Sequence, residues 1–161
     1  MKNRQDGFFL IEAMVALLIF ALGILGMVAM GSTAVSSQSD ARYRTAAANL
    51  ADEMASTIAL NVDRTSAAAT QASVATFTNL PSGAPCTFSG SASLLAAVTA
   101  WRNKASTVGA NLPGLPGASN TQQQIVVDNS ATGFNRVEIT VCWQAPTDSA
   151  MRHHTLVTYV N

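Results

Sequence analysis

The chain has 161 residues, of which 48% are hydrophobic and 11% charged, with a formal net charge of +0. This length fits about one domain with one modest core. The neutral balance excludes nucleic-acid binding through a broadly basic surface. The apolar residues are unevenly distributed, because Glu12 is the only charged residue between Phe8 and Gly31, whereas Ala, Ser, Thr and Asn dominate the remainder. We therefore expect the first part to face lipid and the rest to face water.

The first predicted element is a membrane-spanning helix over residues 8–31, with the sequence FFLIEAMVALLIFALGILGMVAMG. About 20 helical residues cover the roughly 30 Å hydrocarbon core of a bilayer. Lys2 and Arg4 precede the apolar run, which favours a cytoplasmic N-terminus and translocation of the rest. A secretory signal would have a shorter apolar region followed by a small-residue cleavage site, and no such site follows here. The sequence predicts a single-pass anchor.

Glu12 does not fit a plain anchor. A carboxylate costs about 2.5–3.5 kcal/mol on insertion scales at the centre of a bilayer, and less near the interface, where Glu12 lies. Acidic residues inside membranes are functional candidates for this reason. The alternative is that the side chain of Glu12 simply reaches the cytoplasmic interface.

The helix is predicted to continue beyond the membrane. No proline occurs between Gly31 and Pro81, so nothing forces the helix to stop. Apolar side chains then recur at helical spacing, at Tyr43, Ala46, Ala47, Leu50, Met54 and Ile58. We expect one helix from Phe8 to about Leu60, roughly 80 Å long. Its second half, residues 32–60, is amphipathic.

The remaining residues, 61–161, are predicted to form a globular head. Residues 61–93 are weakly patterned and are expected to form a loop, followed by a short helix over about 93–108. Three antiparallel strands are predicted at about 123–127, 135–143 and 155–160. These elements indicate an α+β fold, in which a small antiparallel sheet packs on the long helix.

Cys86 and Cys142 are the only cysteines, and their spacing matches no zinc or CxxC motif. A disulfide between them is the natural interpretation if the head lies outside the cytoplasm. Closing a loop of this size contributes roughly 4 kcal/mol in the chain-entropy description. The alternative is two separate buried thiols that act as small hydrophobic side chains.

Residues suited to catalysis or metal binding are scarce. His153 and His154 are adjacent on a predicted strand and point to opposite faces, so they cannot readily chelate one metal. There is no paired-carboxylate spacing, GxSxG motif, P-loop or GxGxxG motif. We expect no enzymatic activity, no metal and no cofactor.

The segment Gly7-Phe8-Phe9-Leu10-Ile11-Glu12 resembles the type III signal of type IV pilins and of type II secretion pseudopilins. The resemblance implies that a prepilin peptidase removes residues 1–7 by cleaving between Gly7 and Phe8. It also implies that Phe8 becomes N-methylated and that the helix stays on the mature protein. Glu12 is the fifth mature residue, and the resemblance implies that it pairs with the N-terminal amine of a neighbouring subunit and sets the axial register.

The segments LADEMASTIALN and FNRVEITVCWQAP…HTLVTYV resemble the PilV-type minor pilins, also called type IV pilus modification proteins. This implies a pilin-like lollipop fold, and a subunit that helps to prime pilus assembly and modulates pilus number, adhesion or twitching motility. The implied partners are the prepilin peptidase, other minor pilins, the major pilin, the inner-membrane assembly platform and a tip adhesin. The implied location is the inner membrane, with a periplasmic head, and then the pilus fibre at or near its tip.

Two alternatives remain open. A minor pseudopilin of a type II secretion system would carry an indistinguishable signal. An adhesive or DNA-capturing module would need an exposed binding patch. The basic residues of the head form no evident cluster in the sequence, so we expect no nucleic-acid partner; they include Arg64, Arg102, Lys104, Arg136 and Arg152.

Overall fold

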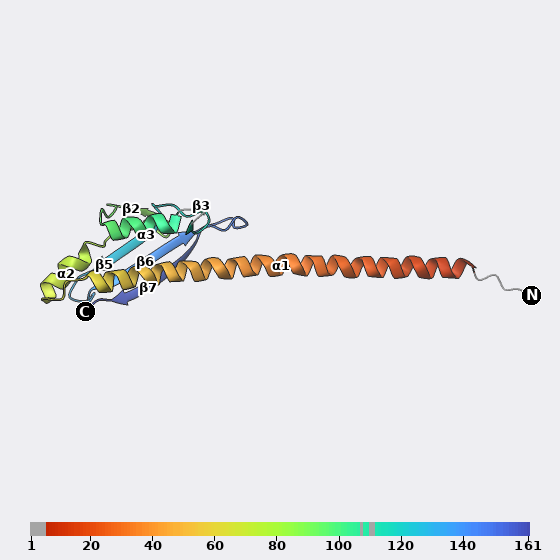
Figure 1. Ribbon diagram of the computed structural model, residues 1–161, viewed down its shortest axis with the longest axis horizontal. Coiled ribbons are helices and arrows are strands. Elements are labelled where there is room, and N and C mark those ends of the chain that lie inside the picture. The colour runs from red at the N-terminus through yellow and green to blue at the C-terminus, as the bar shows by residue number, and fades with distance from the viewer. Residues whose placement is uncertain (1–5, 107, 110–111) are drawn as a thin grey trace, which may run out of the picture. The chain divides into compact units, whose positions relative to one another are not determined.

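The structure is a computed structural model that describes residues 6–106, 108–109 and 112–161 (Figure 1). Residues 1–5, which belong to the expected leader of residues 1–7, lie outside the described residues. The elements in chain order are α1 (Asp6–Asn61), α2 (Ala67–Ala75), β1 (Ser82–Ala84), β2 (Thr87–Ser89), α3 (Ala96–Ser106), β3 (Val108–Gly109), β4 (Leu112–Pro113), β5 (Gln123–Asp128), β6 (Arg136–Trp143) and β7 (Arg152–Tyr159). The chain divides into two compact units, with the boundary between Ala41 and Arg42.

The first unit is the apolar part of α1, up to Ala41. Every side chain described between Phe8 and Met30 is exposed, and Phe8 itself is 75% accessible. The helix is long and apolar enough to cross a membrane by length and composition, with a mean hydropathy of 2.7 over its most apolar window. Because a helix that is apolar all round is unstable in water, this surface requires lipid or other helices around it.

In the second unit, the C-terminal part of α1 buries one stripe of side chains. Leu50, Met54 and Ile58 lie in the core with Ala47 and Ala51, and Tyr43 packs against them at the margin. This spacing confirms the predicted amphipathic half. The indole N–H of Trp101 on α3 donates a hydrogen bond of 2.9 Å to the carbonyl of Leu50, which ties the two helices together.

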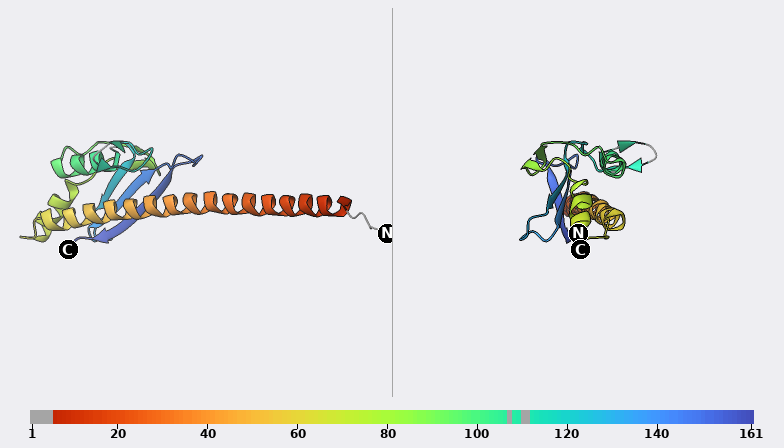
Figure 2. Two further views of the ribbon diagram at one scale, coloured as in Figure 1. Left: turned by 45° about the vertical axis from the view of Figure 1, so that its right-hand side comes forward. Right: turned by 90° about the vertical axis from the view of Figure 1, so that its left-hand side faces the viewer.

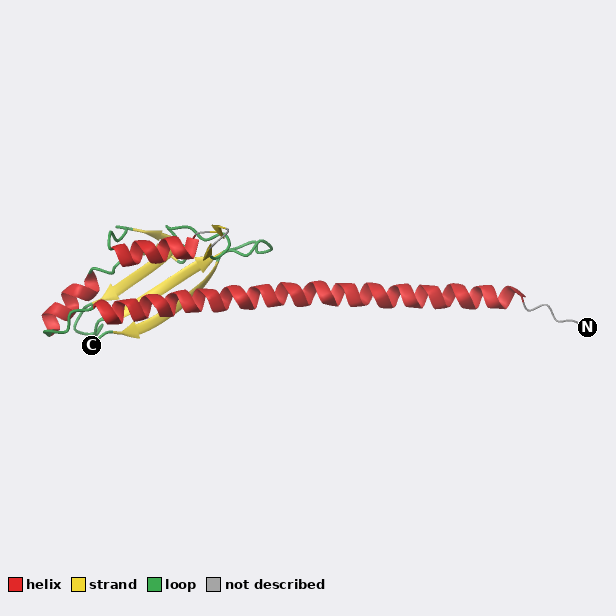
Figure 3. Ribbon diagram, in the orientation of Figure 1, coloured by secondary structure: helices red, strands yellow, loops and turns green. Residues whose placement is uncertain are grey.

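The main sheet is antiparallel, with the strand order β5-β6-β7 (Figure 3). β6 is central, since Ile139 lies opposite Ile125 on one side and opposite Leu156 on the other. Alternate residues of β6 enter the core that includes the α1 stripe, namely Val137, Ile139, Val141 and Trp143. The α+β arrangement, a small antiparallel sheet packed on the long helix, is therefore confirmed. Figure 2 shows α1 and α3 on one side of this sheet and the β1–β2 hairpin on the other.

The prediction that residues 61–93 form an unstructured loop is wrong. They contain α2 and the β1–β2 hairpin. Ser66 caps the N-terminus of α2, because its hydroxyl accepts a hydrogen bond of 3.1 Å from the main-chain N–H of Ala69. Only Thr70 and Val74 of α2 are buried, so this Ala-rich helix carries almost no apolar periodicity. The hydrophobic pattern could not predict a helix that buries so few side chains.

The predicted helix over 93–108 is shorter in the structure, where α3 runs from Ala96 to Ser106. Ser93 lies before the helix, and its hydroxyl accepts from the main-chain N–H of Leu95 at 3.3 Å. Leu94 lies inside the predicted range but is 96% exposed, because it precedes the first helical turn. Val108 belongs to strand β3, so the helix cannot extend to it.

Strand β7 starts at Arg152, three residues before the predicted start at 155. The sequence Arg-His-His has no alternation of apolar and polar residues that would mark a strand. Two contacts place it there: Arg152 pairs with Trp143 in the strand register, and its Nε lies 2.6 Å from Oδ2 of Asp148 in the preceding loop.

The free side of β5 is covered by the segment around Asn79. The main chains of Asn79 and Ile125 exchange hydrogen bonds of 2.9 and 3.0 Å. The buried amide of Asn79 also donates to the carbonyl of Gln123 at 2.6 Å and accepts from the main-chain N–H of Ser93 at 3.0 Å. This edge of the sheet is thereby shielded.

Candidate functional site

The first group of predicted site residues lies at the start of α1. The Gly7–Phe8 bond falls in the first turn of the helix, and the ring of Phe8 is exposed. Phe8 and Glu12 are four residues apart, so their side chains share one side of the helix. They line a shallow hollow on that side together with Ile11, Val15, Ala16 and Ile19.

The carboxylate of Glu12 is exposed among apolar side chains. Among the residues that the structure describes, no salt bridge includes Glu12. A carboxylate that enters a low-dielectric helix bundle needs a cationic partner, because an unpaired buried charge is costly.

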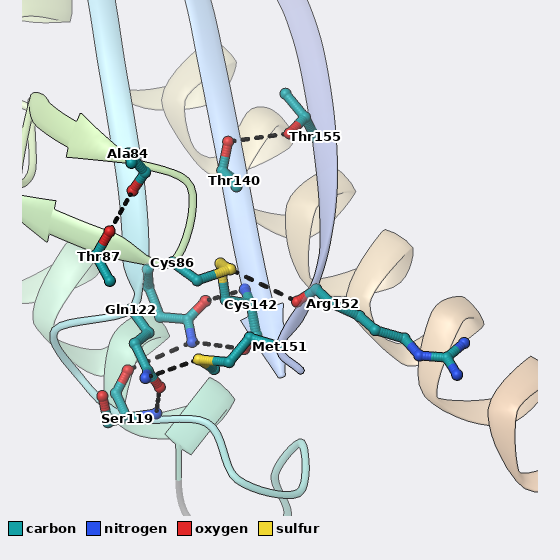
Figure 4. Close-up of a disulfide and its surroundings, with 11 residues drawn as sticks. Ala84, Cys86, Thr87, Ser119, Gln122, Thr140, Cys142, Met151, Arg152 and Thr155 are labelled. Carbon is teal, nitrogen blue, oxygen red and sulfur yellow. Dashed lines mark hydrogen bonds between the residues drawn. A yellow bond between two sulfur atoms is a disulfide. The ribbon is translucent and has the colours of Figure 1, made fainter. Parts of the chain in front are cut away.

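The second group of site residues is the cysteine pair. Cys86 and Cys142 are joined by a disulfide, with 5.7 Å between their Cα atoms (Figure 4). Cys86 sits with Pro85 in the two-residue turn between β1 and β2, and its φ of 65° lies in the left-handed region. Cys142 is fully buried on β6. The disulfide therefore links the tip of the hairpin to the central strand.

The hairpin lies on the face of the sheet that points away from α1, because Cys142 alternates with the core residues Val141 and Trp143. The amide of Gln124 on the same face donates to the carbonyl of Leu80, just before the hairpin, at 2.7 Å. Within the hairpin, Gly83 has a φ of 99°, and a Cβ there would lie 2.4 Å from the carbonyl oxygen of Thr87. Glycine is required at this position of β1.

Gln123 is a structural residue that the sequence analysis did not single out. Its side-chain oxygen accepts from the main-chain N–H of Cys142 and its amide donates to the carbonyl of Cys142, both at 3.2 Å. The side chain thus replaces the strand partner that Cys142 lacks beyond the end of β5. Gln123 is the middle residue of a run of three glutamines at 122–124, and the sequence does not show which of them takes this role.

Removing the disulfide should destabilise the head. We expect the double variant Cys86→Ser/Cys142→Ser to lose about 2–5 kcal/mol of unfolding free energy, because the 56-residue loop is no longer closed in the unfolded chain. The measurement is urea unfolding of the full chain in detergent, followed by tryptophan fluorescence. Thr87→Ala is the control in the same turn, since it removes only an exposed hydrogen bond to Ala84 and should cost within about 0.5 kcal/mol. An unchanged urea midpoint in the double variant would contradict the role of the bridge.

A further hollow of about 380 Å³ lies beside the start of β7, and sequence reasoning missed it. It is lined by Arg44, Trp143, Met151, Arg152, His153 and His154. The guanidinium of Arg152 is held by both carboxylate oxygens of Asp148, with atoms 2.6 and 2.8 Å apart. Three consecutive basic residues at 152–154 were the only available sequence signal.

Two other described cations of the head are paired with carboxylates. Lys104 pairs with Glu53 at 2.5 Å, and Arg136 pairs with Glu138 at 2.6 Å. Among the described residues there is no group of three or more His, Cys, Asp or Glu side chains that could hold a metal ion.

Two surface aspartates have lowered pKa values. Hydrogen bonds from the main chain and side chain of Thr65 lower the pKa of Asp63, and hydrogen bonds from Ser130 lower the pKa of Asp128, with a smaller effect of Arg136. Because the pKa of each carboxyl is lower in the folded than in the unfolded chain, the stabilising effect is present above the unfolded pKa and is lost as the pH falls through the folded pKa. Both carboxylates stabilise turns, because each accepts a hydrogen bond from the main-chain N–H two residues further along the chain.

Comparison with known proteins adds one finding. Residues 2–28 match the family model of the prokaryotic N-terminal methylation motif, a stretch of 27 of the 161 residues. This segment is a type IV pilin-like signal, and it suggests a structural subunit rather than an enzyme. No curated protein and no solved structure matches the chain.

Proposed function

We propose that this chain, which carries the methylation motif over residues 2–28, is a minor pilin that enters a type IV pilus by means of its apolar helix. One observation carries the proposal: a methylation motif and a carboxylate share a helix whose apolar side chains are all exposed from Phe8 to Met30. An anchor alone would need neither the motif nor the carboxylate.

The first step of the proposed pathway is processing. A prepilin peptidase cleaves between Gly7 and Phe8, removes the leader of residues 1–7 and methylates the amine of Phe8. The position of Gly7 before an aromatic residue and a long apolar run supports this assignment. Processing leaves the apolar helix in place with a new positive charge at its end.

The second step is assembly. In the fibre, Glu12 pairs with the N-terminal amine of Phe8 of a neighbouring subunit, which offsets the desolvation of both charges and sets the axial register. The absence of a salt bridge to Glu12 within the described residues supports a partner from another subunit. The subunit is stored in the inner membrane before this step, with its N-terminus in the cytoplasm.

The head then lies in the periplasm. The Cys86–Cys142 disulfide supports this, because disulfides form and persist in oxidising compartments. The partners are the prepilin peptidase, other minor pilins, the major pilin, the assembly platform and a tip adhesin. The likeness of LADEMASTIALN and of the C-terminal strands to PilV-type minor pilins supports a role in priming assembly, at or near the tip.

The test is a deletion of the gene combined with analysis of sheared fibres. We expect the chain in the purified fibre fraction, and a deletion strain that loses twitching motility but keeps type II secretion. Loss of secretion with normal twitching would assign the chain to a type II secretion pseudopilus instead. DNA binding is not favoured, because Lys104, Arg136 and Arg152 of the head are paired with carboxylates.

A further inference from the structure

Strand β7 lies next to β6 at an open edge of the main sheet (Figure 3). It is eight residues long and pairs with β6 along its whole length without a bulge. None of its residues is buried, whereas six of the eight residues of β6 are buried. The outer side of β7 is therefore accessible.

The hydrogen bond just after the C-terminal end of β7 shows which of its residues bond to β6 and which direct their main-chain groups outward. The main-chain N–H of Val160 donates to the carbonyl of Asn135 at 3.2 Å, so this opposing pair is a hydrogen-bonded one. In an antiparallel ladder, hydrogen-bonded and non-hydrogen-bonded pairs alternate. The outward-pointing N–H and C=O groups of β7 therefore belong to His153, Thr155, Val157 and Tyr159.

The hydrogen bonds of β5, at the opposite edge of the sheet, lead independently to the same assignment of outward-pointing residues. Ile125 uses its N–H and C=O for Asn79, so it cannot use them for Ile139, which lies opposite it on β6. Ile139 must then bond to Leu156 on β7, which leaves the main-chain groups of Thr155 and Val157 pointing outward. No main-chain hydrogen bond joins these outward groups to any other described residue.

The two edges of the sheet differ in protection. The β5 edge is covered by Asn79 and the segment around it. Within the described residues, the β7 edge shows fewer protective features. RHHTLVTY contains no proline and no lysine and forms no bulge, and its charged side chain, Arg152, lies at the first position of the strand. Its outward residues include two exposed large apolar side chains, Val157 at 41% and Tyr159 at 57%.

We propose that the β7 edge is a docking site for an extended segment of another protein of the fibre, which adds a fourth strand to the sheet. The row of outward N–H and C=O groups specifies the occupant, since only a second extended main chain satisfies all of them at once. The complementary segment is β-branched or aromatic opposite Val157 and Tyr159, and it has no proline where its N–H faces β7. This inference rests on the proposed function.

The occupant follows from the proposed function, since a minor pilin in a fibre is surrounded by other subunits. The added strand belongs to one of these different subunits. A second copy of this chain is the alternative that the experiment distinguishes.

Hydrogen exchange tests the proposal with the full chain. The exchange of individual amides is measured by mass spectrometry in two pools, the detergent-solubilised membrane pool and the purified fibre. We expect the amides of His153, Thr155, Val157 and Tyr159 to exchange at least tenfold more slowly in the fibre. The amides of Leu156 and Thr158 bond to β6 and are protected in both pools, which makes them the internal control.

A variant pair provides the second arm. Val157→Pro removes an outward N–H but no bond to β6, and proline is tolerated at such edge positions. We expect it to lower incorporation into fibres at least tenfold, whereas Val157→Ala, which keeps the N–H, stays within twofold of the wild type. Protection of the Leu156 amide in the membrane pool verifies that the Val157→Pro variant folds. If this variant does not fold, the exchange data of the wild-type chain decide alone.

The outcomes separate the two proposals. Equal exchange of the four outward amides in both pools, with the chain present in fibres, overturns strand addition and leaves the minor-pilin role intact. A chain that is absent from fibres overturns both. Protection that rises with protein concentration in detergent alone identifies a second copy as the occupant and contradicts the proposed partner.

Discussion

The variant Glu12→Ala is expected to be cleaved and inserted into the membrane normally, and to be nearly absent from fibres. Glu12 lies on α1 with apolar side chains around it, and no salt bridge with another described residue satisfies its carboxylate. If Glu12 pairs in the fibre as proposed, its loss leaves the N-terminal amine of a neighbouring subunit buried without a partner. Removing one member of a buried ion pair costs about 3–5 kcal/mol.

That cost sets the size of the expected effect. Since each 1.4 kcal/mol is about a factor of ten in an equilibrium, incorporation should fall by roughly a hundredfold or more. The measurement is the ratio of the chain in sheared fibres to the chain in the membrane pool, determined by immunoblotting. Val15→Ala is the matched control, because it shortens a side chain in the same hollow without removing a charge. Incorporation of Glu12→Ala at the wild-type ratio would refute the assembly role.

The variant Gly7→Val is expected to accumulate as an uncleaved precursor that stays in the membrane. The resemblance to prepilin signals places the scissile bond directly after Gly7, and a β-branched side chain there obstructs the close approach of the peptidase to the main chain. The precursor also lacks the free amine at Phe8, so it cannot pair with Glu12 of a neighbour and should not enter fibres. Gel mobility and N-terminal peptide mass distinguish the precursor from the mature chain.

The control for this prediction is Gly31→Val. It places the same side chain in the same helix, at a position where a Cβ meets nothing within 4 Å. We expect this variant to be processed like the wild type, since residue 31 is far from the cleavage site. Normal cleavage of Gly7→Val would mean that the peptidase does not use this bond.

Strong periodicity made the long helix and the central strand predictable from the sequence. Leu50, Met54 and Ile58 repeat every four residues, and Val137, Ile139 and Val141 alternate, because each set packs into one core. Both patterns arise from burial on one face. The Cys86–Cys142 pairing was accessible only through a compartment argument, and the structure joins the two residues.

Elements held by polar contacts were not predictable. α2 buries only Thr70 and Val74, and the start of β7 depends on Arg152 and Asp148. The shielding of the β5 edge by Asn79 and the support of Cys142 by Gln123 are side-chain contacts across long sequence separations. A single amide side chain in a sequence gives no sign of such partners. The assignment of the outward-pointing main-chain groups of β7 likewise required the strand register of the structure.

The most direct test of the minor-pilin assignment is the mass of the N-terminal peptide of the chain isolated from its native membrane and fibres. We expect a chain that begins at Phe8 and carries one methyl group on its amine, with the leader of residues 1–7 absent. A chain that still begins at Met1, or one cut after the apolar run near Gly31, would contradict it.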